Sequence, residues 1–215
     1  MKFIGKSHVE GGIPTVILSG GQSRRMNRND KAFLSISDRT LLEIVIDRLR
    51  LQTQHVAINT NSKSLKYTKH GLPVLKDQIG GFLGPLAGIL TAMEWANDIG
   101  CEKVATVAVD TPLFPKTLLK ELNQKMKVSN SDIVFAASRS DRKKKKVLHP
   151  VFGLWKTCLF EDLRKELEKG IRKVTLWSER HNASCVCFSD ERIDPFFNVN
   201  TPHDIIPLRE FLADK

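Results

Sequence analysis

The sequence has little that would place the protein in a membrane or outside the cell. No apolar run approaches the roughly 20 residues that span a bilayer, and residues 1–12 contain no apolar stretch of signal-peptide type. Cysteine is scarce, with 4 among 215 residues. The close pair Cys185 and Cys187 has no second pair with which to form a zinc site. We therefore predict a cytoplasmic protein whose cysteines are buried or half-buried thiols.

Two common nucleotide-binding signatures are also absent. The chain has no G-x-G-x-x-G motif and no Gly-Lys-Ser/Thr sequence at the spacing of a P-loop. It has instead the apolar run Thr15–Leu18, then Ser19, Gly20 and Gly21, followed by four cations: Arg24, Arg25, Arg28 and Lys31. Glycines let backbone N–H groups approach an anion closely. The stretch predicts a nucleoside triphosphate site, although taken alone it also suits a solvated loop.

The chain has fewer acidic than basic residues: 24 Asp and Glu against 34 Lys and Arg, which gives a net charge of +10. Residues 139–146 carry six cations and one carboxylate, which is half of that excess. The rest is spread along the chain, as suits an enzyme with polyanionic substrates. A basic nucleic-acid-binding protein is a competing interpretation, but the sequence lacks the interleaved aromatic residues and recognised motifs of such proteins.

Strand-like and helix-like segments alternate along the chain. Strands are predicted at Thr15–Leu18, Val56–Ile58, Pro73–Leu75, Val104–Val109, Ile133–Ala137, Val151–Trp155 and Cys185–Phe188. Helices are predicted after the capping box of Thr40 and Glu43, at Pro85–Ala96, Leu118–Met126, Phe160–Lys169 and Val174–Glu179, and after Thr201. The alternation predicts an α/β fold, a Rossmann-like three-layer sandwich with a mostly parallel central sheet.

We predict a single domain, since no linker-like stretch divides the chain. In parallel sheets ligands bind at the carboxyl ends of strands, and Gly20, Asn59 and Asp110 each follow a predicted strand. Asp110 ends a fully apolar strand, where a carboxylate is costly unless it is satisfied. It is a candidate ligand for Mg²⁺, which needs one or two carboxylates plus substrate phosphates. The alternative is a cap for the helix that follows.

The glycine turn and its surroundings resemble a known family. L-x-G-G-x-S-x-R-M followed by D-K resembles the signature of nucleotidyltransferases, which transfer NMP from an NTP and release pyrophosphate. Within that superfamily the chain resembles the molybdenum cofactor guanylyltransferases, the MobA family. Six further segments match in order between about residues 13 and 206: Ile58–Asn61, Pro73–Asp77, Gly84–Gly88, Val109–Pro112, His149–Trp155 and Phe197–Pro202.

The resemblance implies a nucleotidyltransferase-type domain over residues 1–215. Its nucleotide-binding half would lie at about 13–137 and its acceptor-binding half at about 138–210. The implied reaction transfers GMP from GTP to the terminal phosphate of molybdopterin, with Mg²⁺ as cofactor, and gives the guanine dinucleotide form of the molybdenum cofactor. Contacts with proteins that make or accept the cofactor are implied as well. Neither a membrane nor a nucleic acid is predicted as a partner.

The resemblance also assigns roles to individual residues. It implies that Arg25, Lys31 and Asp110 are catalytic, with Asp110 as the metal ligand. It implies that the nucleotide or cofactor is bound by Leu18, Ser19, Gly20, Gly21, Lys31, Asn59, Asp77, Gly84, Gly88, Asp110, Asn198 and Asn200. Asn59 and Asp77 match guanine-side positions, and a carboxylate can accept from both guanine N1–H and N2–H₂. Cytosine and uracil have no such paired donor edge, so this favours GTP.

The chain differs from the family pattern at several positions, and other functions are compatible with its sequence. Ser19 replaces the alanine usual in the family, a small residue for a small one that we expect to be tolerated. Asn27 and Arg28 replace family glycines, which raises the alternative of a non-catalytic relative. A cytidylyltransferase or sugar-phosphate nucleotidyltransferase of the same fold is the main competing enzyme. His149 and the basic loop 139–146 are expected near the molybdopterin, although the loop also suits a solvated charge run.

Overall fold

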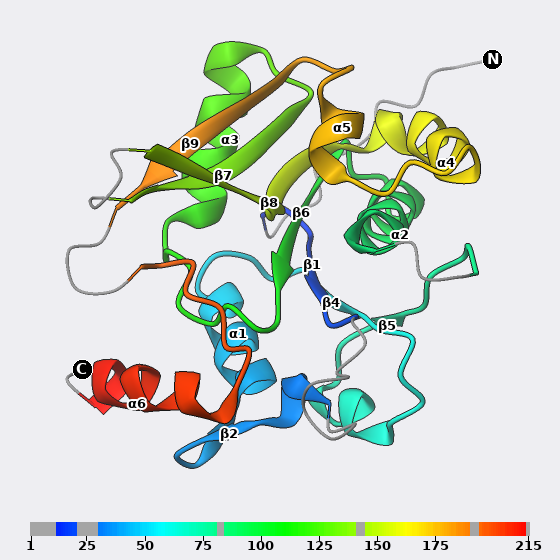
Figure 1. Cartoon of the computed structure of the whole chain (residues 1–215). Helices are drawn as coiled ribbons and strands as arrows, with labels where there is room; N and C mark the ends of the chain where they lie inside the picture. The colour runs from blue at the N-terminus through cyan, green and yellow to red at the C-terminus, as the bar shows by residue number, and fades with distance from the viewer. Residues whose placement is uncertain (1–11, 21–29, 81–83, 141–144, 190–193, 214–215) are drawn as a thin grey trace.

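The computed structural model describes residues 12–20, 30–80, 84–140, 145–189 and 194–213 (Figure 1). Within them lies a seven-stranded sheet of order β5-β4-β1-β6-β8-β7-β9. Its strands are β1 (Thr15–Leu18), β4 (Val56–Asn59), β5 (Val74–Leu75), β6 (Lys103–Ala108), β7 (Ile133–Ser140), β8 (Lys145–Lys156) and β9 (Ala183–Phe188). Neighbouring strands are parallel except at β8, which runs antiparallel to β6 and β7. The predicted α/β fold with a mostly parallel sheet is confirmed.

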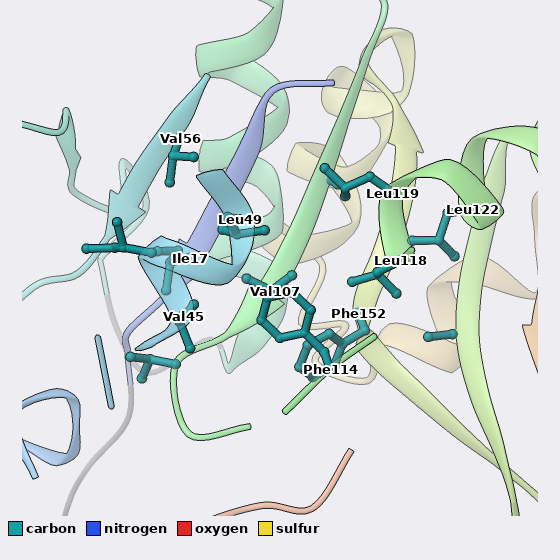
Figure 2. Packing of buried hydrophobic residues seen from close by; sticks show 14 of the residues in the cluster. Ile17, Val45, Leu49, Val56, Val107, Phe114, Leu118, Leu119, Leu122 and Phe152 are labelled. Atoms are coloured by element: carbon teal, nitrogen blue, oxygen red, sulfur yellow. The ribbon is translucent and has the colours of Figure 1, made fainter. Parts of the chain in front are cut away.

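Helices cover both faces of the sheet because alternate strand residues point to opposite sides. Val16 and Leu18 of β1 pack with α2 (Pro85–Asp98), α4 (Phe160–Glu168) and α5 (Val174–Ser178). Ile17 points to the other face, against α1 (Leu41–Arg50) and α3 (Leu118–Ser129). Figure 2 shows this second cluster, in which Val45 and Leu49 of α1 lie close to Ile17. The three layers follow the periodicity of the sequence.

The start of α1 is held by the predicted capping box. The Glu43 backbone N–H donates to Thr40 Oγ1 at 3.3 Å, and the Thr40 N–H donates to Glu43 Oε2 at 2.7 Å. Just before it, β2 (Ser35–Ile36) and β3 (Arg39–Thr40) form a small hairpin. These two strands were not predicted from the sequence. The two-residue strands are too short to leave a periodic signal.

The C-terminal segment returns to this hairpin. The 3-10 turn η4 (Pro202–Asp204) leads into α6 (Ile205–Ala213), and Asp204 accepts a hydrogen bond from the Thr201 N–H at 2.7 Å. The helix predicted after Thr201 is therefore present, although its first turn is 3-10 rather than α. Hydrophobic residues join α6 to the hairpin and α1, namely Ile36, Leu41, Ile44, Leu113, Val199, Ile205 and Leu208. This packing carries residues 195–204 back toward the amino-terminal half.

The four cysteines differ in their exposure to solvent. Cys101 is buried and Cys185 half-buried, as expected, but Cys158 and Cys187 are exposed, so the prediction is wrong for those two. Their places, at the turn before α4 and on the edge strand β9, face solvent.

The helices of the described ranges are all too short or too polar to cross a bilayer. The assignment of one domain in two halves stays a prediction.

The capping box gives a test of the fold. Replacing Thr40 with Ala removes the acceptor for the Glu43 N–H, and loss of such a cap typically lowers the free energy of unfolding by about 1 kcal/mol. Urea denaturation should show a lower midpoint for Thr40→Ala. Thr40→Ser, which keeps the hydroxyl, should remain close to wild type. Equal midpoints for all three proteins would contradict the role given to this cap.

Candidate functional site

The carboxyl ends of three adjacent parallel strands form one edge of the sheet. Leu18 at the end of β1 pairs in register with Asn59 of β4 and with Ala108 of β6. The ladder continues past the strand ends, because the Ser19 N–H donates to Asn59 O at 2.8 Å and the Val109 N–H donates to Leu18 O at 3.2 Å. This edge therefore brings together Leu18, Ser19, Gly20, Asn59 and Asp110.

Asp110 is the centre of the first cluster at this edge. Its side chain is 25% exposed, and Lys31 Nζ lies 3.7 Å from Oδ2. Thr111 Oγ1 donates to Oδ1 at 3.4 Å. Burial raises the pKa of the Asp110 carboxyl, while the Lys31 charge and hydrogen bonds from Thr111 and Asn198 oppose that rise. Because burial makes the charge of this carboxylate costly, the Lys31 cation beside it stabilises the ionised form.

The C-terminal asparagines complete this cluster. Lys31 Nζ donates to Asn200 Oδ1 at 2.8 Å, and the Val199 backbone N–H donates to Asp110 O at 2.8 Å. Asn198 contacts Asp110 through its side chain. Lys31, Asp110 and the pair Asn198 and Asn200 were predicted from three separate motifs, and the structure places all four residues together.

Asp77 is the centre of a second cluster at the same edge. Asn59 Nδ2 donates to Asp77 Oδ1 and Asn61 Nδ2 donates to Asp77 Oδ2, both at 2.8 Å. The Asp77 N–H donates to Asn61 Oδ1 at 3.1 Å, and Thr91 Oγ1 lies 3.4 Å from Asp77 Oδ1. The predicted pair Asn59 and Asp77 is therefore in contact. The carboxylate is held in one orientation, and its oxygens have further lone pairs for a ligand.

Two residues of this cluster were not assigned a role from the sequence. Asn61 lies two residues after Asn59, and side chains at that spacing share one side of an extended chain, so the signal was available within the matched segment. Thr91 lies on α2, and its contact with Asp77 depends on how that helix packs. No local pattern marks it.

The predicted glycines of α2 have different surroundings. Gly84 caps the helix with a φ of 68°, a conformation that favours glycine. Gly88 is buried, and a Cβ atom there would lie 2.6 Å from Asn59 Oδ1 and 3.0 Å from Leu18 Cδ2. Glycine at position 88 therefore lets α2 approach the strand ends and leaves Asn59 free to reach Asp77.

Other predicted residues lie outside the described ranges or farther along the chain. Gly21 and Arg25 are outside the described residues, as are Asn27 and Arg28. The ends of the basic loop belong to the β7–β8 hairpin, where Arg139 pairs with Lys146. His149 of β8 stacks on Phe196 at 4.2 Å between ring centroids, and its Nε2 lies 2.8 Å from Ser138 Oγ. Burial lowers the pKa of His149, which favours a neutral ring at pH 7.

The carboxylates of the site suit a metal that shares its ligands with a substrate. Within the described ranges, no group of three or more His, Cys, Asp and Glu side chains is placed to enclose a metal ion. Mg²⁺ does not need such a cage, since it is commonly held by one or two carboxylates plus substrate phosphates. Asp110, half-buried beside Lys31, has the donor type for that mode of binding.

Comparisons with known proteins find relatives over most of the chain. The family model described as "MobA-like NTP transferase domain" matches residues 15–184. The chain is 37% identical over 204 residues to the molybdenum cofactor guanylyltransferase of Bradyrhizobium sp. (strain ORS 278), covering 94% of this chain and 93% of that protein.

Solved structures share the fold at lower identity. The crystal structure of molybdopterin-guanine dinucleotide biosynthesis protein A from Archaeoglobus fulgidus has a TM-score of 0.73 and 18% identity, with 94% of this chain and 100% of that chain covered. The 2-C-methyl-D-erythritol 4-phosphate cytidylyltransferase of Thermus thermophilus has a TM-score of 0.70 and 17% identity, with 93% and 98% covered. Since proteins named for different activities share this fold, the fold alone does not identify the nucleotide.

Gly88 provides a test of the site geometry. In Gly88→Ala the new methyl group would collide with Asn59 and displace it from Asp77. We expect GTP to bind roughly 10- to 100-fold more weakly, the range that corresponds to one hydrogen bond with a charged group. Gly80→Ala is a matched control, since its Cβ would have no neighbour within 4 Å. Calorimetry showing wild-type affinity in both variants would contradict the packing argument.

Proposed function

The chain belongs to the family of MobA-like NTP transferases, and from that premise we propose that it is a molybdenum cofactor guanylyltransferase. It transfers GMP from GTP to the terminal phosphate of molybdopterin and releases pyrophosphate. The observation that carries the proposal is the presence of two clusters on one sheet edge. Asp77, which follows β5, is held by the side-chain amides of Asn59 and Asn61, and Asp110 lies beside Lys31 just after β6.

Asp77 is the proposed guanine-binding residue. Asn59 and Asn61 each donate to a different oxygen of its carboxylate, which fixes the carboxylate plane. Each oxygen retains a lone pair that can accept a further hydrogen bond. Guanine presents N1–H and N2–H₂ side by side, so both can donate to Asp77. Cytosine and uracil lack this paired donor edge, and this difference favours GTP over CTP and UTP.

Asp110 is the proposed Mg²⁺ ligand, with Asn198 close enough to contribute through a water molecule. Burial raises the pKa of Asp110, so a bound cation offsets the cost of its charge. The ion would supply positive charge at the phosphates of the nucleotide. Lys31 contacts both Asp110 and Asn200 and is proposed to bind the same phosphates. Arg25, which lies outside the described residues, is proposed to do likewise.

The transfer requires positioning rather than proton abstraction. An oxygen of the molybdopterin phosphate forms a bond to the α-phosphorus of GTP. The bond from that phosphorus to the oxygen bridging to the β-phosphate breaks, and pyrophosphate leaves with that oxygen and its electron pair. The attacking phosphate is already ionised at pH 7, so no side chain needs to act as a general base. Lys31 stabilises the negative charge on the α-phosphate and the leaving group.

The acceptor side of the site is proposed to lie toward β7 and β8. His149 and the basic hairpin ends Arg139 and Lys146 belong to these strands, and the hairpin cations would attract a phosphate from a distance. Backbone groups of Leu18, Ser19, Gly20 and Gly21, together with Gly84 at the α2 terminus, are proposed to contact the nucleotide. The cytoplasm and contacts with cofactor-synthesis or acceptor proteins belong to the same proposal.

Pyrophosphate release separates this function from a cytidylyltransferase. With Mg²⁺ and molybdopterin, we expect release from GTP and little from CTP or UTP. Asp77→Asn replaces half of the acceptor pair with a donor, so GTP affinity should fall roughly 10- to 100-fold. Asp98→Asn, at an exposed carboxylate on α2, is the control. Preferential use of CTP, or unchanged GTP affinity in Asp77→Asn, would contradict the guanine assignment.

Asp110→Asn tests the metal assignment. The variant keeps the size of the side chain and removes its charge, so we expect pyrophosphate release to be nearly abolished. Burial raises the pKa of Asp110 in the folded state, so its charged form opposes folding above the ordinary pKa. The thermal midpoint at pH 7 should therefore be unchanged or higher. A wild-type rate at saturating Mg²⁺ would refute the assignment, and Asp132→Asn, which removes a surface ion pair, should behave like wild type.

A further inference from the structure

Tyr67 has a buried hydroxyl group to which neither the sequence motifs nor the proposed mechanism gives a role. It is the one tyrosine in the sequence and lies in the 3-10 turn η2 (Leu65–His70), which follows β4. Its side chain is 1% exposed. A buried phenol needs a hydrogen-bond partner, and the partners of this one belong to the nucleotide side of the site.

The Tyr67 hydroxyl joins two side chains from different parts of the chain. It donates to Asp30 Oδ2 at 2.7 Å, and it lies 2.7 Å from Ser19 Oγ. An ionised carboxylate can only accept, so the tyrosine proton goes to Asp30 and Ser19 donates to the tyrosine oxygen. Burial raises the pKa of Tyr67 well above its ordinary value, which keeps it protonated and able to donate. The result is a directed chain from Ser19 through Tyr67 to Asp30.

Both ends of this chain adjoin residues of the proposed site. Ser19 directly follows β1, where its N–H donates to Asn59 O. Asp30 caps the 3-10 turn η1 (Lys31–Phe33), accepting from the Ala32 N–H at 3.3 Å. The Tyr67 ring also packs edge-on against Phe33, with 4.8 Å between centroids. Tyr67 thus contacts residues on both sides of Lys31 in the chain.

We propose that Tyr67 is a positioning residue, which acts through Asp30 to hold Lys31 against Asp110 and also holds Ser19 at the end of β1. The chemical part of this inference rests on the proposed function, whereas the placement of Lys31 does not. The serine at position 19 then has its own role. Its hydroxyl donates the hydrogen bond that Tyr67 accepts. The alanine that is usual in the family at this position could not make this contact.

The first test compares nucleotide binding in Tyr67→Phe, Ser19→Ala and the double variant. Lys31 would contact phosphates rather than the base, so Tyr67→Phe should weaken GTP and CTP binding by a similar factor, about tenfold. Under turnover, KM for GTP should rise and kcat should fall, with KM for molybdopterin unchanged. The double variant should lose less than the product of the two single losses, because both remove the same chain. Loss confined to GTP, or full additivity, would overturn the proposal.

The second test needs neither substrate nor activity. Lys31 in the wild type has a side chain that is 22% exposed and is held by Asn200 and Asp110. Pulsed acetylation followed by mass spectrometry should show several-fold faster modification of Lys31 in Tyr67→Phe. Thr68→Val is the matched control, since it removes from the same turn a hydroxyl that donates to Leu65 O at 2.8 Å. An unchanged Lys31 rate, together with a lower thermal midpoint, would show that Tyr67 is merely structural.

If wild-type protein fails to release pyrophosphate while Tyr67→Phe still exposes Lys31, the proposed function is wrong and the positioning role stands. If release occurs with GTP and Tyr67→Phe changes neither Lys31 reactivity nor the kinetic constants, the proposed function stands and the positioning role is wrong. The two claims therefore fail in different experiments.

Discussion

The burial of one carboxylate, Asp110, is the constraint on which the arrangement of the site depends. At the end of a central strand it is expensive to charge, and burial raises its pKa. Lys31, Thr111 and Asn198 gather around it and offset that cost. Lys31 is also bonded to Asn200, which lies 169 residues away in the sequence. Residues from distant parts of the sequence are thus gathered around one carboxylate.

The order of the strands brings the clusters around Asp77 and Asp110 to one edge of the sheet. β4, β1 and β6 lie side by side and parallel, so the residues that follow them face the same side of the molecule (Figure 1). Asp77 follows β5 and accepts a hydrogen bond from Asn59 at the end of β4, while Asp110 follows β6, and the end of β1 lies between β4 and β6. A nucleotide with its base at Asp77 and its phosphates at Asp110 would pass over the end of β1. The packing of α6 against the β2–β3 hairpin and α1 brings Asn198 and Asn200 beside Asp110 and Lys31.

The sequence predicts the elements of this fold well because their signals are local. The capping box at Thr40, the apolar run of β6 and the proline that opens α2 each depend on neighbouring residues. Motif resemblance placed Lys31, Asn59, Asp77 and Asp110 in one site, and the structure brings them to one edge, while their roles stay predictions. The contacts of Tyr67 were not predicted, because its partners Asp30 and Ser19 lie 37 and 48 residues away. A single contact over that distance leaves no periodic or motif signal.

The central claim is that one sheet edge binds guanine at Asp77 and metal-bound phosphates at Asp110. A crystal structure of the protein with GTP and Mg²⁺ tests it most directly. The account predicts an Asp110 oxygen within about 2.1 Å of the ion and the guanine N1–H and N2–H₂ groups donating to Asp77. An ion bound away from Asp110, or a guanine placed over β7 and β8 with no contact to Asp77, would contradict it.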